Sequence, residues 1–148
     1  MLRAKDLMTK KIVSIGPNNT MLEVSQLMTN RNLRHLVVQE NGKLIGILSD
    51  RDLLKSMRSD LIDSKHMELS LNSTQKVHDY MNWPVYVVME STSVQKVIEE
   101  FLSQRVSAFV VENNKGEMKG IITIDDILEY FLGLIQDDEK NYHHERLY

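Results

Sequence analysis

The sequence predicts an α+β fold made of two copies of one β-α-β-β-α unit. Two observations carry this prediction: glycines recur at a fixed offset, and the same order of β-rich and helix-patterned runs appears twice. The chain has 148 residues, of which 42% are hydrophobic and 26% charged. That size and balance suit one ordinary globular domain or two small ones.

The repeat is visible in the glycines. Gly42 matches Gly116, and Gly46 matches Gly120, both at an offset of 74 residues. Upstream the offset becomes 73, and the extra residue falls in a turn sequence, where an insertion costs little. We therefore expect one repeat at residues 1–57 and a second at 76–136, separated by a linker at 58–75 and followed by an acidic tail at 137–148.

The first half of each copy predicts a short strand followed by a helix. Apolar β-rich runs occupy residues 12–15 and 85–88. Turn and N-cap residue types follow at 17–19 and 90–93. Apolar residues then recur at helical spacing, which predicts a helix in each copy; they are Met21, Val24, Leu27 and Met28, and Val94, Val97, Ile98 and Phe101.

The second half of each copy predicts a β-hairpin and a closing helix. β-rich runs at 36–38 and 45–48 flank one glycine turn, and runs at 109–111 and 120–122 flank the other. The closing helices are indicated by apolar positions at helical spacing, namely Leu53, Leu54 and Met57, and Ile127, Leu128, Phe131, Leu132 and Ile135. Met8, Met28, Met57 and Met81 stand at apolar positions and are interpreted as core fillers.

Composition excludes several classes of protein. There is no cysteine, which removes disulfides, thiolate metal sites and cysteine nucleophiles. No apolar run approaches the roughly 18 residues of a membrane span, and no signal peptide follows Met1, so we expect a cytoplasmic protein without membrane insertion. His143, His144 and Glu145 could suggest a metal site, but a solvated tail is the preferred interpretation, and no metal is predicted.

Charge is divided unevenly along the chain. The net charge of −3 argues against a nucleic-acid binder. Residues 1–73 hold 11 Lys/Arg and 8 Asp/Glu, a balance of +3, whereas residues 74–148 hold 7 and 13, a balance of −6. The two repeats therefore differ in electrostatics although they share a pattern.

Three signatures, in order, resemble a known family. An opening signature stands at residues 5–9 and 78–82, a central one at 34–38, and a closing one at 46–52 and 120–126. Together they resemble a tandem pair of CBS (cystathionine β-synthase) domains, also called a Bateman module. The resemblance covers nearly the whole chain except the linker and tail.

The resemblance implies both a fold and a class of ligand. Two units would pack about a pseudo-two-fold axis and leave two clefts between them. Such clefts often bind adenine nucleotides or related adenosyl compounds. Such pairs usually regulate an attached or associated enzyme, transporter or channel, and tend to form homodimers.

The closing signature has two interpretations. Ser49 with Asp52, and Thr123 with Asp126, fit a capping box at the start of a helix. By resemblance, Asp52 and Asp126 would instead accept hydrogen bonds from ribose hydroxyls, with Gly46 and Gly120 in the same motifs. The neighbouring hydroxyl and the helix N-terminus would favour a phosphate.

The resemblance also places the phosphate contacts in the repeat opposite the ribose aspartate. The cleft of Thr123 and Asp126 would then face Arg34, His35 and Arg51. The cleft of Ser49 and Asp52 would face Ser107, Ala108 and Asp125, which offer no cation. We therefore predict one phosphorylated nucleotide per chain, at Thr123 and Asp126, while the other cleft is empty or takes an uncharged adenosine-like group.

The cationic residues have other interpretations as well. Arg34 could be a surface ion-pair residue, and Arg51 a solvated helix residue. Beside Arg34, His35 is expected to be neutral without an anion and charged when it contacts phosphate. Ligand affinity is then expected to fall between about pH 6 and 8.

The functional prediction is a regulatory ligand-sensing module, with a role in energy sensing if its ligand is AMP, ADP or ATP. The alternative is a dimerisation or protein-interaction platform that binds no nucleotide, and a regulatory fragment of a larger enzyme or transporter is a third reading. No nucleophile elbow, His-Glu-x-x-His or Walker loop appears, so no enzyme activity and no obligatory cofactor are predicted. No catalytic domain is expected within the chain, so its output would act on another, unidentified protein or through a part of the protein outside this sequence. S-adenosylmethionine, a cyclic dinucleotide and a guanine nucleotide stay open as ligands.

Overall fold

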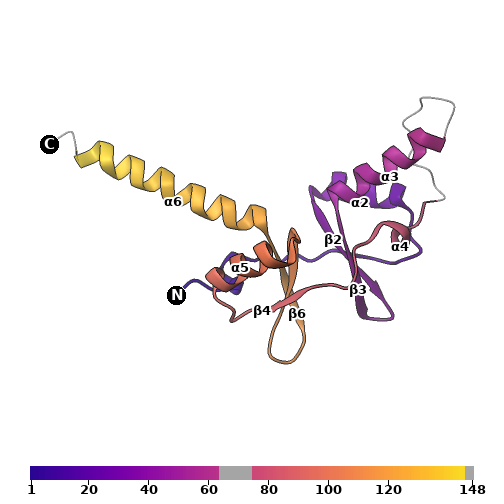
Figure 1. The fold of residues 1–148 in the computed structure, drawn as a ribbon, viewed down its shortest axis with the longest axis horizontal. Coiled ribbons are helices and arrows are strands. Elements are labelled where there is room, and N and C mark those ends of the chain that lie inside the picture. Colours follow the sequence, from indigo (N-terminus) through magenta and orange to yellow (C-terminus); the bar gives the residue numbers. More distant parts are fainter. Residues whose placement is uncertain (64–74, 146–148) are drawn as a thin grey trace. The chain divides into compact units, whose positions relative to one another are not determined.

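The computed structural model describes the backbone of residues 1–63 and 75–145, and the side chains of residues 1–57 and 75–140. This part of the chain contains six helices and six strands, and the strands form two three-stranded sheets (Figure 1). The predicted α+β class is confirmed. The elements are α1 (Ala4–Leu7), β1 (Ser14–Ile15), α2 (Met21–Arg31), β2 (His35–Glu40), β3 (Lys43–Ser49), α3 (Asp50–Asp63), α4 (Val77–Tyr80), β4 (Val87–Met89), α5 (Val94–Gln104), β5 (Ala108–Glu112), β6 (Met118–Thr123) and α6 (Ile124–Glu145).

The two sheets have the same topology. In the first, β1 pairs parallel with β2, and β2 pairs antiparallel with β3. In the second, β4, β5 and β6 repeat this arrangement. Gly42 and Gly116 take positive φ of 76° and 73° in the turns between the antiparallel strands, a conformation that glycine adopts without steric cost.

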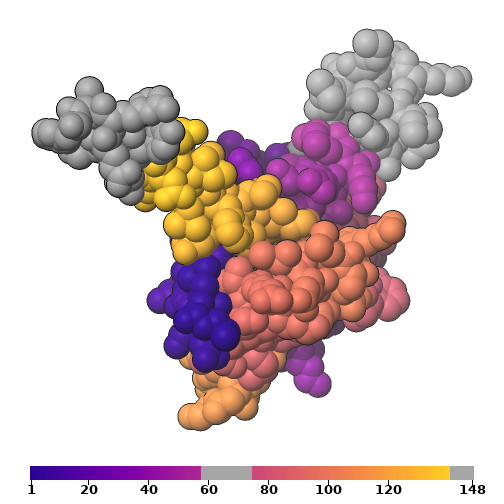
Figure 2. Space-filling view, turned by 60° about the vertical axis from the view of Figure 1, so that its left-hand side comes forward, coloured from indigo at the N-terminus to yellow at the C-terminus, as the bar shows by residue number. Residues whose placement is uncertain are grey.

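The chain forms two compact units, and each contains the opening segment of the other repeat. One unit is Ile12–Val85, and the other combines Met1–Lys11 with Tyr86–Tyr148. Figure 2 shows the N-terminal segment, in indigo, lying against the orange atoms of the second repeat. The Ala4 amide donates to the Thr92 carbonyl at 2.8 Å, and in the other unit the Val77 amide donates to the Asn19 carbonyl at 2.9 Å.

Each unit has its own cluster of buried apolar residues. In the unit Ile12–Val85, the cluster combines α2, β2 and β3 with Val77 from the opening segment of repeat two. In the other unit, the cluster centres on α5, β5 and β6 and includes Ala4. Met28 is buried, while Met8 and Met81 are partly buried against the two clusters, as expected of core fillers.

Apart from shifts of one or two residues at strand ends, the observed elements differ from the predicted ones in four places. The opening segments contain the short helices α1 and α4, which the β-α-β-β-α pattern lacks. The N-cap of α2 is Thr20, one residue beyond the predicted turn; its side chain accepts from the Glu23 amide. Asn19 and Thr20 in turn donate to the Glu23 carboxylate, which lowers the pKa of that group.

The other two differences concern the closing helices. Helix α3 continues to Asp63, so it takes up the first part of the predicted linker 58–75. Of the rest of that linker, residues 64–74 lie outside the described part of the chain, and Gln75 is described. Helix α6 runs for 22 residues to Glu145 and takes in most of the predicted tail, whose last residues, 146–148, also lie outside the described part. Of the helices described, none combines the length and the apolar character that crossing a bilayer requires.

Candidate functional site

The closing signatures join a strand to a helix at the same edge of each unit. Strand β3 ends at Ser49 and α3 begins at Asp50, while β6 ends at Thr123 and α6 begins at Ile124. The sheet register places His35 opposite Ser49, and Ala108 opposite Thr123. The central and closing signatures therefore meet in the unit Ile12–Val85, and the matching residues of the second repeat meet in the other unit.

Both closing signatures are helix caps. The Ser49 amide and hydroxyl donate to Asp52 Oδ2 at 2.8 and 3.0 Å. The Thr123 amide and hydroxyl donate to Asp126 Oδ2 at 2.7 and 2.9 Å, and the Asp126 amide donates back to Thr123 Oγ1 at 3.2 Å. The capping box is complete at Thr123 and Asp126, while at Ser49 the bonds to the Asp52 carboxylate supply one half of it. A carboxylate has a second oxygen, so capping does not exclude a further role.

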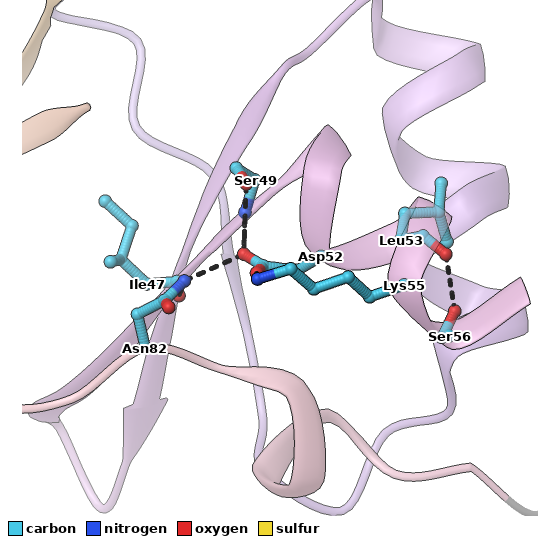
Figure 3. A network of polar contacts seen from close by, with 7 residues as sticks. All are labelled: Ile47, Ser49, Asp52, Leu53, Lys55, Ser56 and Asn82. Carbon is cyan, nitrogen blue, oxygen red and sulfur yellow. Dashed lines mark hydrogen bonds and ion pairs between the residues drawn. The ribbon is translucent and has the colours of Figure 1, made fainter. Parts of the chain in front are cut away.

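Asp52 is enclosed within its unit. Asn82 donates from Nδ2 to Asp52 Oδ2 at 2.8 Å, and Lys55 Nζ lies 4.0 Å from Oδ1 (Figure 3). The Asp52 residue is only 3% exposed. A side chain from the opening segment of the other repeat therefore donates a hydrogen bond to the Asp52 carboxylate.

Asp126 is more open. It is half-buried, and its hydrogen bonds within the described residues are those with Thr123, all on Oδ2 or the backbone amide. Oδ1 has no protein donor among those residues. Asp126 can therefore accept a further pair of donors, as a ribose diol would supply.

Gly46 and Gly120 admit the opening segments. A Cβ at Gly46 would lie 2.5 Å from Met81 Sδ, and a Cβ at Gly120 would lie 2.7 Å from the Thr9 carbonyl oxygen. Met8 Sδ is also close, at 2.8 Å from that position. Within the units, both glycines serve the packing of a methionine from the opening signature.

The predicted cations gather at the start of α3. Arg34 directly precedes His35, and its carbonyl accepts from the Asp50 amide at 2.9 Å, next to Arg51. Arg34 and Arg51 are exposed, and His35 is half-buried. This places the three predicted phosphate contacts in the unit Ile12–Val85, and Thr123 and Asp126 in the other unit.

The equivalent edge of the second unit carries no cation at the matching positions. The Ser107 carbonyl accepts from the Ile124 amide at 3.2 Å, as Arg34 does for Asp50. Ala108 follows Ser107, and Asp125 is exposed next to Asp126. The local backbone is thus shared, while the charge at this edge is reversed.

Asn82 is the site residue that sequence reasoning missed. It belongs to the opening signature of repeat two, whereas the carboxylate that it binds lies 30 residues earlier in the chain. The offset of 73 residues aligns Asn82 with Thr9 of the first repeat, so the repeat indicates a polar side chain at this position in both copies. The side-chain groups of described residues form no cluster suited to a metal ion.

Comparison with known proteins identifies two CBS domains. The model of the CBS domain family matches residues 4–59 and 77–133. A curated relative, the magnesium and cobalt efflux protein CorC of Escherichia coli, is 31% identical over 140 residues, which are 92% of this chain and 44% of that protein. The chain therefore spans less than half the length of this relative.

Two solved structures share the fold. The CBS domain pair of protein MJ0100, in complex with 5′-methylthioadenosine and S-adenosyl-L-methionine, has a TM-score of 0.72 at 23% identity and covers 90% of this chain and 98% of its own. The cytosolic domain of the Mg²⁺ channel MgtE, in complex with ATP, has a TM-score of 0.65 at 24% identity and covers 86% of this chain and 48% of its own.

Proposed function

Because the chain belongs to the CBS domain family, we propose that it is a regulatory ligand-sensing module. It binds an adenine nucleotide (AMP, ADP or ATP) or a related adenosyl compound, and it passes the ligand state to a partner protein. Relatives of the same fold that hold ATP, 5′-methylthioadenosine or S-adenosyl-L-methionine support this class of ligand.

The observation that carries the proposal is the open carboxylate of Asp126. Oδ2 is committed to the cap, and Oδ1 receives no hydrogen bond from the described residues. Hydrogen bonds to a charged acceptor contribute about 1.5–3 kcal/mol each. The proposed role of Asp126 is to accept the ribose hydroxyls, beside the N-terminus of the 22-residue helix α6.

The proposed phosphate contacts are Arg34, His35 and Arg51. Exposed arginines present planar donors that match phosphate oxygens, and both Arg34 and Arg51 are exposed. We propose that these residues contact the phosphate groups of a bound nucleotide. Asp52 is not proposed to serve a phosphorylated ligand, because its carboxylate is already engaged by Ser49 and Asn82.

A thermal-shift screen tests the proposal. The probes are AMP, ADP, ATP, GTP, S-adenosylmethionine and a cyclic dinucleotide, each added to the wild-type chain and to Asp126→Asn. A ligand at 100 times its dissociation constant stabilises by about 2.7 kcal/mol, which is several degrees for a domain of this size. Asparagine can still accept from the Thr123 amide, so Asp126→Asn keeps the cap while it removes the charge.

The matched control is Glu129→Gln, which removes one negative charge from an exposed position of the same helix. We expect an adenosyl probe to raise the melting temperature of the wild type and of Glu129→Gln, but not of Asp126→Asn. An equal shift in all three proteins would contradict the assignment of Asp126. No shift with any probe would favour a platform that binds no nucleotide.

One observation favours that second candidate, a dimerisation or protein-interaction platform. Helix α6 exposes apolar residues at helical spacing, of which Leu128 and Ile135 are 60% and 56% exposed. Phe131 lies between them and is 43% exposed. Such a stripe marks an interaction surface. Light scattering on the wild type and on Leu128→Glu would test it: a homodimer should become a monomer, and an unchanged mass would exclude this face.

A further inference from the structure

The two opening segments dock on the closing strands through the same backbone contacts. In one unit, Ile47 and Asn82 exchange N–H···O bonds of 3.1 and 2.9 Å. In the other, Ile121 and Thr9 exchange bonds of 3.0 and 2.8 Å. Asn82 and Thr9 therefore stand at equivalent positions relative to Asp52 and Asp126.

Their side chains differ in reach. The Asn82 amide nitrogen lies one bond further from Cβ than the Thr9 hydroxyl does. Asn82 Nδ2 reaches Asp52 Oδ2 at 2.8 Å (Figure 3). Thr9 makes no such bond to Asp126, whose carboxylate accepts from Thr123 alone among the described residues.

The bond from Asn82 limits the ability of Asp52 to accept hydrogen bonds from ligand hydroxyls. Asp52 Oδ2 already accepts from the Ser49 amide, the Ser49 hydroxyl and Asn82. A carboxylate oxygen offers about two lone-pair sites, so Oδ2 is saturated, and burial restricts access to Oδ1. A ligand diol would have to displace Asn82, a donor that the fold itself already holds in place.

We infer that Asn82 is a specificity-determining residue that closes Asp52 to ligand hydroxyls, and that Thr9 leaves Asp126 open. The choice between the two aspartates is then set by one residue in each opening signature. The inference rests on the proposed function for the class of ligand, but the contact between Asn82 and Asp52 does not depend on any ligand.

Exchanging the two residues tests the inference. Asn82→Thr gives the second opening signature the residue of the first, and Thr9→Asn makes the reciprocal change. Equilibrium dialysis with labelled adenosine, which carries no phosphate for Asp125 to repel, counts the sites in each protein. We expect one adenosine per wild-type chain, two per Asn82→Thr chain, and at least a tenfold loss of affinity in Thr9→Asn.

A ligand-free double-mutant cycle tests the contact between Asn82 and Asp52 separately from ligand binding. Melting temperatures of Asn82→Ala, Asp52→Ala and the double variant should be non-additive, whereas those of Thr9→Ala, Asp126→Ala and their double variant should add. Additive changes in the first cycle would overturn the inference, as would an unaltered site count in Asn82→Thr. If the wild type binds none of adenosine, AMP, ADP, ATP and S-adenosylmethionine, the proposed function fails, and the first cycle still decides whether Asn82 engages Asp52.

Discussion

Asp52 and Asp126 occupy the same position in two units with the same sheet topology, but their surroundings differ. Asp52 is buried beneath Asn82, whereas Asp126 is half-buried and has an oxygen available. The cations are divided in the same unequal way, with Arg34 and Arg51 matched by Ser107 and Asp125. A repeat can thus keep its backbone and its helix cap while side chains from elsewhere in the chain give each copy a different role.

The largest expected effect concerns ligand affinity. Asp126→Ala should weaken binding of ATP about 100-fold or more, because at least two charge-assisted hydrogen bonds are lost. Asp52→Ala should change it less than about threefold, since its carboxylate serves the fold. Titration followed by intrinsic fluorescence gives both affinities. Equal losses of ATP affinity in the two variants would remove the distinction between Asp52 and Asp126.

The order should reverse for stability in the absence of ligand. Asp52→Ala leaves the Ser49 amide and the Asn82 side chain without their acceptor, at a cost of about 2–3 kcal/mol. Asp126→Ala loses only a cap, at about 1 kcal/mol. Urea unfolding monitored by circular dichroism measures both. A greater loss in Asp126→Ala would show that the structural and ligand-binding roles are assigned to the wrong aspartates.

The two closing-motif glycines should also differ. A Cβ at Gly120 meets the Thr9 backbone at 2.7 Å, whereas a Cβ at Gly46 meets the flexible end of Met81 at 2.5 Å. Gly120→Ala should therefore destabilise by about 2 kcal/mol and Gly46→Ala by about 1 kcal/mol or less. Thermal unfolding of the two variants is the measurement, and a larger effect at Gly46 would be inconsistent with a rigid contact at Thr9.

The smallest expected effect concerns the cations. Arg51→Ala should weaken ATP binding about threefold, because an exposed charge contributes at most about 1 kcal/mol. The loss should shrink at high salt and should be absent for adenosine. Affinities for ATP and adenosine at two ionic strengths check this, with Lys55→Ala as the control on the same helix. An equal loss for adenosine would assign Arg51 a role other than phosphate binding.

Local pattern was sufficient for much of the fold. The helical spacing around Val24 and Val97 and the caps at Ser49 and Thr123 depend on residues within one or two helical turns, so the sequence predicts them. The glycine offset can be read directly from the sequence. The full length of α6 was not predicted, because its polar end lacks the apolar periodicity on which the prediction relied.

Long-range docking was beyond sequence reasoning. Each opening segment packs in the unit of the other repeat. The residues around Met8 and Met81 do not indicate that Met8 packs against Gly120 and Met81 against Gly46. The bond from Asn82 to Asp52 depends on that docking. The site could therefore be predicted as a set of residue types, but the difference between the surroundings of Asp52 and Asp126 is visible only in the structure.

The most direct test of the account is the stoichiometry of ATP binding, measured by isothermal titration calorimetry on the wild-type chain and on Asp126→Ala. One ATP per wild-type chain and binding at least about 100-fold weaker in the variant are predicted. Two ATP per chain, or unchanged binding in Asp126→Ala, would contradict the claim that Asp126, and not Asp52, serves a phosphorylated ligand.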